Sequence, residues 1–259
     1  MSSIKLIVLI PNKTPKENKL LPFCFFEMPN RCLVSPKIGC AAHCSYCYLN
    51  EIGETDHRKE DKDVLLERII SDPRYKEGRY GTVVSLGCFT ECLSESIRDD
   101  SLFLLKYFIK KNNKVSIATK LDPSILIPAL KDYIQYNDQI NIFISCPTIS
   151  KWTEYETGTI APTLRLNSIP FLQDVHFNCF LYIKPFLGEA TLCDLQIFKC
   201  YIEKYHLTTI LGKKFSLSPG ESAPIAGDRL HVVEDPRYYS FKIALSEYGE
   251  IYERSIDVL

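Results

Sequence analysis

Short β-branched runs alternate with longer segments of helical periodicity from about residue 31 onward. The runs that predict strands lie at 31–36, 82–87, 114–119, 140–146, 176–184 and 208–211. Apolar residues at helical spacing predict helices at 60–71, 101–111, 124–134, 161–174 (interrupted by Pro170) and 192–205. Such an alternation is typical of a parallel sheet with helices on its outer face. Because about six units fall short of the eight that close a barrel, we predict an α/β fold with a partial, curved (β/α)6 barrel of the TIM type.

The two ends of the chain depart from this alternation. The run IKLIVLI at 4–10 predicts a strand that ends at Pro11-Asn12. Near the other end, the segment FKIALSEYGEIYER at 241–254 predicts a β-hairpin that turns near Tyr248-Gly249. We therefore expect an N-terminal strand or extension over 1–30, a core domain over 31–212, and a C-terminal loop and hairpin extension over 213–259.

Composition and charge describe an ordinary globular protein. Hydrophobic residues make up 46% of the 259 residues and the formal net charge is −1, so disorder is excluded and charge gives no help to a grip on long nucleic acid. The basic runs at 110–114 and 213–214 are short and predict solvated faces. The N-terminal apolar run is too short for a secretory core, and no stretch approaches the length of a membrane span. We expect a cytoplasmic protein without a membrane segment, in which clustered cysteines bind metal or perform chemistry.

Three of the eleven cysteines fall in one short loop, GCAAHCSYCYLN at 39–50. Cys40, Cys44 and Cys47 directly follow the first predicted strand of the barrel, at the edge where βα folds keep their chemistry. A structural zinc site needs four ligands, and the nearest further pair, Cys88 and Cys92, comes about forty residues later. On a [4Fe–4S] cluster, by contrast, three thiolates leave one iron open to a small chelating molecule such as S-adenosylmethionine. A zinc site and another iron–sulfur role remain the alternatives.

The spacing CxxxCxxC resembles the signature of the radical S-adenosylmethionine superfamily. A glycine precedes Cys40, and an aromatic residue, Tyr46, precedes Cys47, as in that superfamily. The resemblance implies a [4Fe–4S] cluster on Cys40, Cys44 and Cys47, and S-adenosylmethionine as the second cofactor. It further implies reductive cleavage to methionine and a 5′-deoxyadenosyl radical that takes a hydrogen atom from the substrate. A reductant such as flavodoxin or ferredoxin would supply the electron.

Further segments make a narrower resemblance, to the spore photoproduct lyase family. Tyr46 and Tyr48 flank Cys47, and one of them is expected to lie against the adenine because aromatic faces give efficient contacts. After the second predicted strand, GCFTE at 87–91 is similar to the family's segment with a cysteine hydrogen donor, a small hydroxyl residue and an acid. These positions are Cys88, Thr90 and Glu91.

The likeness continues in the same order through to about residue 190. Lys120 falls on a lysine that contacts the S-adenosylmethionine carboxylate, and Ser145 on a serine with a cofactor role. YETGT at 155–159 and the following TLRL make Arg165 a candidate carboxylate partner, and YIKPF at 182–186 is similar to the family's strand ending in proline. The resemblance thus implies catalytic roles for Cys88, Tyr48 and Thr90, and cofactor binding by Tyr46, Glu91, Lys120, Ser145 and Arg165.

Each of these residues also has a purely structural interpretation. Lys120 as a solvated lysine, Ser145 as a strand-end cap and Cys88 as a buried thiol are the alternatives, and so is Arg165 paired with Glu156 on an exposed helix face. The two tyrosines can serve as packing residues, and Cys92 as a partner thiol or a core residue. Four other cysteines in apolar segments are expected to be small buried hydrophobes: Cys146, Cys179, Cys193 and Cys200.

The C-terminal segment separates this chain from the lyase. The lyase's hairpin is basic and aromatic and enters duplex DNA, whereas the predicted hairpin here carries Glu247, Glu250 and Glu253 at its tip. Cleavage of a thymine dimer in DNA is therefore not carried over. We expect a monomeric enzyme acting on a nucleobase- or nucleic-acid-derived substrate. The alternatives are a peptide or small metabolite as the substrate, or a non-catalytic metal-binding or electron-transfer module.

Overall fold

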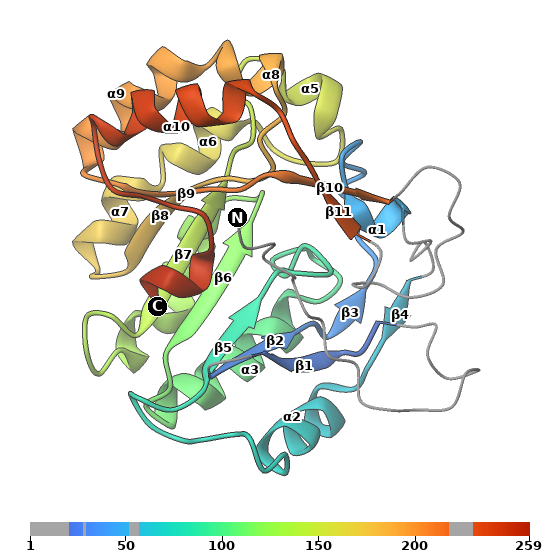
Figure 1. The fold of residues 1–259 in the computed structure, drawn as a ribbon. Coiled ribbons are helices and arrows are strands. Elements are labelled where there is room, and N and C mark those ends of the chain that lie inside the picture. Colours follow the sequence, from blue (N-terminus) through green and yellow to red (C-terminus); the bar gives the residue numbers. More distant parts are fainter. Residues whose placement is uncertain (1–20, 28–29, 52–56, 218–229) are drawn as a thin grey trace.

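The structure is a computed structural model that describes residues 21–27, 30–51, 57–217 and 230–259 (Figure 1). The strand expected at 4–10 lies outside these residues. An eight-stranded sheet runs in the order β1-β2-β5-β6-β7-β8-β9-β12, with β1 antiparallel to β2 and all other neighbours parallel. Its strands are β1 (Cys24–Glu27), β2 (Arg31–Val34), β5 (Val83–Leu86), β6 (Val115–Thr119), β7 (Ile140–Ser145), β8 (Asn178–Ile183), β9 (Thr208–Leu211) and β12 (Ile251–Tyr252).

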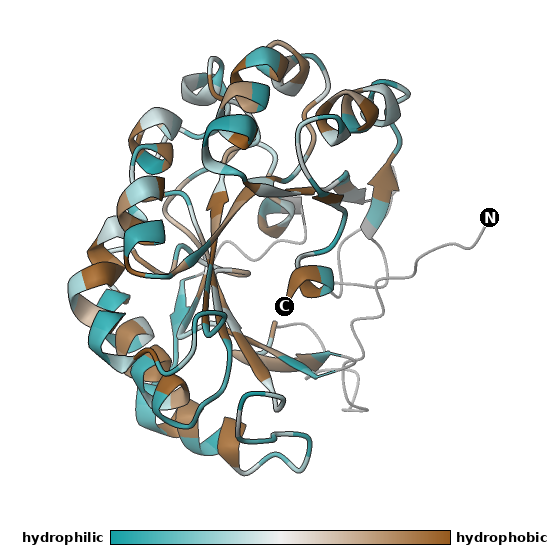
Figure 2. Ribbon diagram, turned by 90° about the vertical axis from the view of Figure 1, so that its left-hand side faces the viewer, coloured by the Kyte–Doolittle hydropathy of each residue, from teal (hydrophilic) through white to brown (hydrophobic). Residues whose placement is uncertain are grey.

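All six predicted core strands are therefore confirmed, together with the curved parallel sheet of a partial barrel. Figure 2 shows the helices along the outer face of the sheet and the C-terminal end on the opposite, concave side. The helices are α1 (Tyr48–Glu51), α2 (Lys62–Ile70), α3 (Arg98–Lys110), α4 (Leu126–Leu130), α5 (Trp152–Tyr155), α6 (Pro162–Leu166), α7 (Ile169–Asp174), α8 (Glu189–Leu192), α9 (Leu195–Tyr205) and α10 (Arg237–Ser246). Short 3₁₀ turns span Pro123–Ile125, Lys131–Tyr133 and Ser255–Val258. No helix in these ranges is long and apolar enough to cross a membrane.

Local sequence signals explain most helix ends. The Asp61 carboxylate caps α2 by accepting from the backbone N–H groups of Asp63 and Val64. The break expected near Pro170 is confirmed, because α6 ends at Leu166 and α7 begins at Ile169. Helix α3, by contrast, begins at Arg98 without a side-chain cap. Asp99 and Asp100 lie inside its first turn, where carboxylates face the positive end of the helix.

The predicted C-terminal β-hairpin is wrong. Residues 237–246 form α10, since Tyr238, Phe241 and Leu245 fall at helical spacing and are all buried. The Phe241 ring packs on Phe186 and Phe198 with centroid distances of 5.3 and 6.2 Å. The chain then returns as β12, which extends the main sheet in parallel with β9 and does not pair back on the preceding segment.

Two small antiparallel pairs flank the open end of the barrel. β3 (Lys37–Ile38) pairs with β4 (Arg58–Lys59), and β10 (Lys214–Leu217) pairs with β11 (Leu230–Val233). β10 lies beside α1, next to the cysteine loop (Figure 1). β1 lies in the expected N-terminal extension and β12 in the expected C-terminal extension. The main sheet therefore includes one strand from each of them.

Alternate residues of the strands face the concave side. On β8, Cys179, Leu181 and Ile183 are buried in the core, whereas Phe180 and Tyr182 are half-buried and face the opposite way. The Phe143 ring of β7 stacks on Phe180 at 4.9 Å and meets Tyr182 edge-on at 5.6 Å. The concave face is therefore lined by aromatic rings below the strand ends.

Candidate functional site

Cys40, Cys44 and Cys47 lie together in a small cluster at the carboxyl edge of the sheet. They pack with Ala42 and Tyr46 in one group of side chains, and all three are free thiols. Burial raises the pKa of the Cys44 thiol to about 11, while the nearby ammonium of Lys120 acts in the opposite direction. Bound metal would stabilise the thiolate forms that burial disfavours.

A segment that follows α5 fixes the shape of this loop. The backbone N–H of Ser45 donates to the Tyr155 carbonyl at 2.9 Å, and that of Gly158 donates to the Ala42 carbonyl at 3.0 Å. A Cβ at Gly158 would lie 2.4 Å from the Ala41 carbonyl oxygen, so only glycine permits this approach. We call Tyr155 to Thr159 the strap, because it braces the cysteine loop from the far side of β7.

Glu156 in the strap is the centre of a buried polar network. The Tyr46 hydroxyl donates to its carboxylate, and Arg165 Nη2 donates to the other carboxylate oxygen at 2.8 Å. Arg165 thus pairs with Glu156, as the structural interpretation predicts. Both side chains are fully buried, however, so the pair does not lie on an exposed helix face. Arg165 Nη1 also donates to the Ser145 carbonyl at 2.6 Å, which links the network to the end of β7. Burial and the neighbouring carboxylate raise the pKa of Tyr46, which keeps its hydroxyl protonated and donating.

The segment after β5 joins the cysteine loop to β6. The Glu91 carboxylate accepts from the Thr119 hydroxyl at 2.6 Å and from the Lys120 backbone N–H at 2.8 Å. The Thr90 hydroxyl donates to the Gly39 carbonyl at 3.0 Å. The Tyr48 hydroxyl donates to the carbonyl of the neighbouring residue 88 at 2.9 Å. Tyr48, Thr90 and Glu91 thus hold backbone at the site, and their direct contact with substrate or cofactor stays a prediction.

Lys120 directly follows β6, and Ser145 is the last residue of the neighbouring strand β7. The Lys120 ammonium lies 5.8 Å from the Tyr46 ring centroid. Burial acts to lower the pKa of Lys120, but Glu156, Cys44 and Glu91 together raise it above its ordinary value. The Ser145 hydroxyl is buried and has no hydrogen-bond partner among the described residues. The buried hydroxyls of Ser35, Ser101 and Thr209 are unpaired in the described ranges as well. It is therefore the place of Ser145 at the carboxyl end of β7, next to Lys120, that makes it a candidate contact for a bound molecule.

Cys88 and Cys92 occupy different surroundings. Cys92 is fully buried in the main core, as the core interpretation predicts. Cys88 is half-buried. Burial raises the pKa of its thiol, while Arg31 and Lys184 lie close enough to oppose this. Of the other cysteines, Cys146 and Cys179 are buried as expected. Cys193, in the turn between α8 and α9, and Cys200, on α9, are exposed, so the expectation for these two is wrong.

The donor set of the loop can be compared with what a metal centre requires. Among the described residues, no three His, Cys, Asp or Glu side chains converge on a point where they could hold one metal ion. Each thiolate of a [4Fe–4S] cluster binds a different iron, so the ligands of a cluster need not meet at one point. Three free thiols in one loop, beside an orphan hydroxyl and a lysine, fit a cluster with one open iron.

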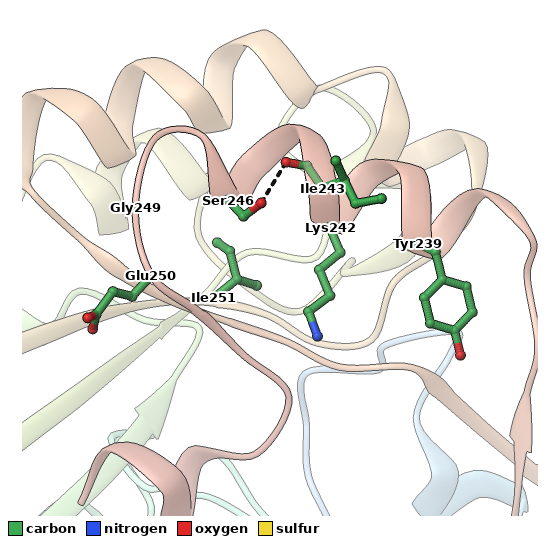
Figure 3. Close-up of a pocket in the computed structure, with 7 residues that line it drawn as sticks. All are labelled: Tyr239, Lys242, Ile243, Ser246, Gly249, Glu250 and Ile251. Atoms are coloured by element: carbon green, nitrogen blue, oxygen red, sulfur yellow. Dashed lines mark hydrogen bonds between the residues drawn. The ribbon is translucent and has the colours of Figure 1, made fainter. Parts of the chain in front are cut away.

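A separate cavity of about 630 Å³ lies on the outside of the barrel between α10 and β12 (Figure 3). Tyr239, Lys242 and Ile243 line it from the helix, and Glu250 and Ile251 from the strand. None of the predicted site residues borders it.

Comparisons with known proteins agree on the fold. No protein-family model matches the chain, and no curated protein sequence matches it. Among solved structures, spore photoproduct lyase complexed with dinucleoside spore photoproduct is similar with a TM-score of 0.62 and 15% identity over 86% of this chain and 76% of the lyase. A single-substitution variant of the lyase is similar with a TM-score of 0.64 and 14% identity, over 98% of this chain and 89% of the lyase chain. Streptococcus suis SuiB is similar with a TM-score of 0.58 and 13% identity, over 86% of this chain and 48% of SuiB. The fold expected from the sequence resemblance is confirmed, and at these identities the likeness extends to the fold alone.

Proposed function

We propose that this chain is a radical S-adenosylmethionine enzyme. The observation that carries the proposal is the group of three free thiols at the sheet edge, with the orphan Ser145 hydroxyl and the Lys120 ammonium on adjoining strands. The fold supports it, since one of the similar lyase structures is described as holding S-adenosylmethionine and dinucleoside spore photoproduct.

Cys40, Cys44 and Cys47 would hold a [4Fe–4S] cluster, with one iron left for the cofactor. When bound, this group supplies the electron that cleaves the sulfonium of S-adenosylmethionine. The strap and the segment after β5 hold the loop from two sides, so the three thiols need little reorganisation to bind metal.

Lys120 and Ser145 would orient S-adenosylmethionine. An ammonium at the end of β6 pairs with the cofactor carboxylate, and Glu91 fixes the Lys120 backbone that carries it. The Ser145 hydroxyl supplies a hydrogen bond that the protein itself leaves unused. Arg165 acts through the Ser145 carbonyl, and its direct contact with a carboxylate is the less favoured role because most of its donors are already occupied.

Cys88 would return a hydrogen atom to a substrate radical. Its thiol is half-buried, and the Tyr48 hydroxyl holds the Cys88 carbonyl. Protonation of the thiol is favoured by burial, which is the state a hydrogen donor requires. Tyr48 and Thr90 then serve the reaction by positioning this segment.

A nucleobase- or nucleic-acid-derived substrate is our first choice, because a similar lyase structure is described with a dinucleoside spore photoproduct. The second choice is a peptide, since SuiB is described as bound to the precursor peptide SuiA. We further propose a cytoplasmic monomer that receives electrons from a flavodoxin or ferredoxin, and that acts as a lyase or modifies C–C or C–H bonds.

Anaerobic reconstitution with iron and sulfide tests the assignment. The wild-type chain should bind about four iron atoms and show visible iron–sulfur absorption. Alanine at Cys40, Cys44 or Cys47 should abolish that absorption, whereas Cys200→Ala, the exposed control, should retain it. Full iron content in all three loop variants would overturn the proposal.

A further inference from the structure

Lys184 lies at the open end of the barrel and has no role in the site described above. It follows β8 directly and continues the alternation of Phe180 and Tyr182, so it belongs to the concave row of that strand. Its side chain is half-buried, and its ammonium lies 5.8 Å from the ring centroid of Phe215 on β10.

The stem of Lys184 is held in one path. A Cβ at Gly212 would lie 2.5 Å from both Cγ and Cδ of Lys184, so the alkyl chain packs flat against glycine backbone. The Gly212 N–H donates to the Ile183 carbonyl at 3.1 Å and the Phe186 N–H donates to the Gly212 carbonyl at 2.7 Å, which fixes that backbone beside β8. The position of the ammonium therefore follows from packing and is not that of a free surface lysine.

The charge of Lys184 has no counter-ion among the described residues. Its neighbour Lys213 pairs with Glu234 at 2.9 Å, and Arg31 lies 3.7 Å from Glu27, but no ion pair forms at Lys184. A half-buried cation without an ion pair loses hydration that no described acidic residue restores. An anion bound from solution would restore it.

The surroundings of the ammonium point to the substrate side of the site. Two cations, Arg31 first and Lys184 second, both act to lower the pKa of the Cys88 thiol, so Lys184 faces the same side of the barrel mouth as that thiol. Lys120 ends β6, two strands away, which places the two ammonium-bearing strand ends roughly 10 Å apart across the sheet. The cation near the cysteine loop and the cation near Cys88 thus occupy different parts of the barrel mouth.

We propose that Lys184 binds an anionic group of the substrate, a phosphate or a carboxylate, and thereby places the substrate at Cys88. This inference rests on the proposed function for the identity of the occupant, and it assigns that substrate to an anionic class. The Phe215 ring lies beside the ammonium and suits a planar group next to the anion.

Alkylation of Cys88 tests the site without knowledge of the substrate. Cluster-loaded protein is treated with iodoacetate, an anion, or with iodoacetamide, its neutral counterpart, and labelling of the Cys88 peptide is followed by mass spectrometry. The ratio of the two rates cancels changes in thiolate fraction and accessibility. Lys184→Gln should lower this ratio about fivefold, whereas Lys184→Arg, which keeps the charge, and Lys213→Gln, at the paired neighbour, should leave it near the wild-type value.

Protection experiments then identify the anion. Inorganic phosphate or acetate should slow labelling by iodoacetate in the wild type but not in Lys184→Gln. Protection by phosphate alone assigns a phosphate-bearing substrate, and protection by acetate alone assigns a carboxylate. An unchanged ratio in Lys184→Gln, or protection by neither anion, would overturn the inference. The labelling needs no cleavage of S-adenosylmethionine, so absence of deoxyadenosine from the wild type would remove the proposed function while this result stood by itself.

Discussion

At the scale of single residues, the site contains polar groups that make no direct hydrogen bond or ion pair with the part of the chain that the structure describes. The Ser145 hydroxyl is buried without a hydrogen bond, and Lys120 has no ion pair within the described residues. Arg165 and Glu91 differ, since their charges are met by Glu156 and by backbone and hydroxyl donors. Groups of the first kind are available to a cofactor, and groups of the second kind hold the site together.

Lys120→Met should bind S-adenosylmethionine about ten- to a hundredfold more weakly, because it removes a charge-assisted contact worth about 1.5–3 kcal/mol while keeping the apolar stem. Equilibrium binding to the cluster-loaded protein measures this. Lys131→Met, at an exposed lysine away from the site, is the control. Equal affinity of the two variants would show that Lys120 is a solvated lysine.

Cys88→Ala should still form deoxyadenosine with the native substrate, since cluster assembly and the first hydrogen abstraction precede the proposed donor step. The substrate radical would instead be trapped by other species, so mass spectrometry of the products should show adducts in place of the native product. Cys92→Ala should lower the free energy of unfolding by about 1–3 kcal/mol and leave the product unchanged. Native product at the normal rate from Cys88→Ala would refute the donor role.

At the scale of elements, the strap after α5 and the C-terminal helix were the least visible in the sequence. Glu156 and Tyr46 are 110 residues apart in the chain, so no local pattern announces their contact. The sequence singled out YETGT at 155–159 only through its resemblance to the family, and not as a segment that contacts the cysteine loop. The alternating Phe241, Ile243 and Leu245 favoured a strand, yet burial of Tyr238 with Phe241 and Leu245 shows that the 3.6-residue period decides.

Glu156→Gln should destabilise the protein by about 3–5 kcal/mol, because it leaves the buried Arg165 charge without its carboxylate. Urea unfolding of the metal-free chain measures the loss. Glu154→Gln, in the adjacent exposed Lys151 pair, should change stability by at most about 0.5 kcal/mol. Similar small effects from both substitutions would contradict the buried network.

Phe241→Ala and Ile243→Ala distinguish helix from strand at the C-terminus. On a strand both side chains would share one face, but on α10 Phe241 is buried and Ile243 is 65% exposed. Phe241→Ala should therefore cost about 3–5 kcal/mol and Ile243→Ala at most about 0.5 kcal/mol in thermal or urea unfolding. Comparable losses at the two positions would favour the hairpin.

At the scale of the whole molecule, the parallel sheet brings the predicted site residues together. The cysteine loop, Cys88, Lys120 and Ser145 all follow or end strands that run the same way, so their carboxyl ends meet at one edge. This was predictable from sequence because β-branched runs mark the strands, and the motifs directly follow these runs in the chain. The partners of the long-range contacts, such as Lys184 and Gly212, were not, since only the pairing of β8 with β9 sets these two residues side by side.

The central claim is that this chain cleaves S-adenosylmethionine at a cluster held by its cysteine loop. Its most direct test is the yield of 5′-deoxyadenosine from anaerobically reconstituted, dithionite-reduced protein, measured by chromatography and mass spectrometry. The wild type and Cys200→Ala should both form deoxyadenosine, and Cys47→Ala should form none. Absence of deoxyadenosine from a wild-type chain that carries its iron, or equal yields from Cys47→Ala, would contradict the account.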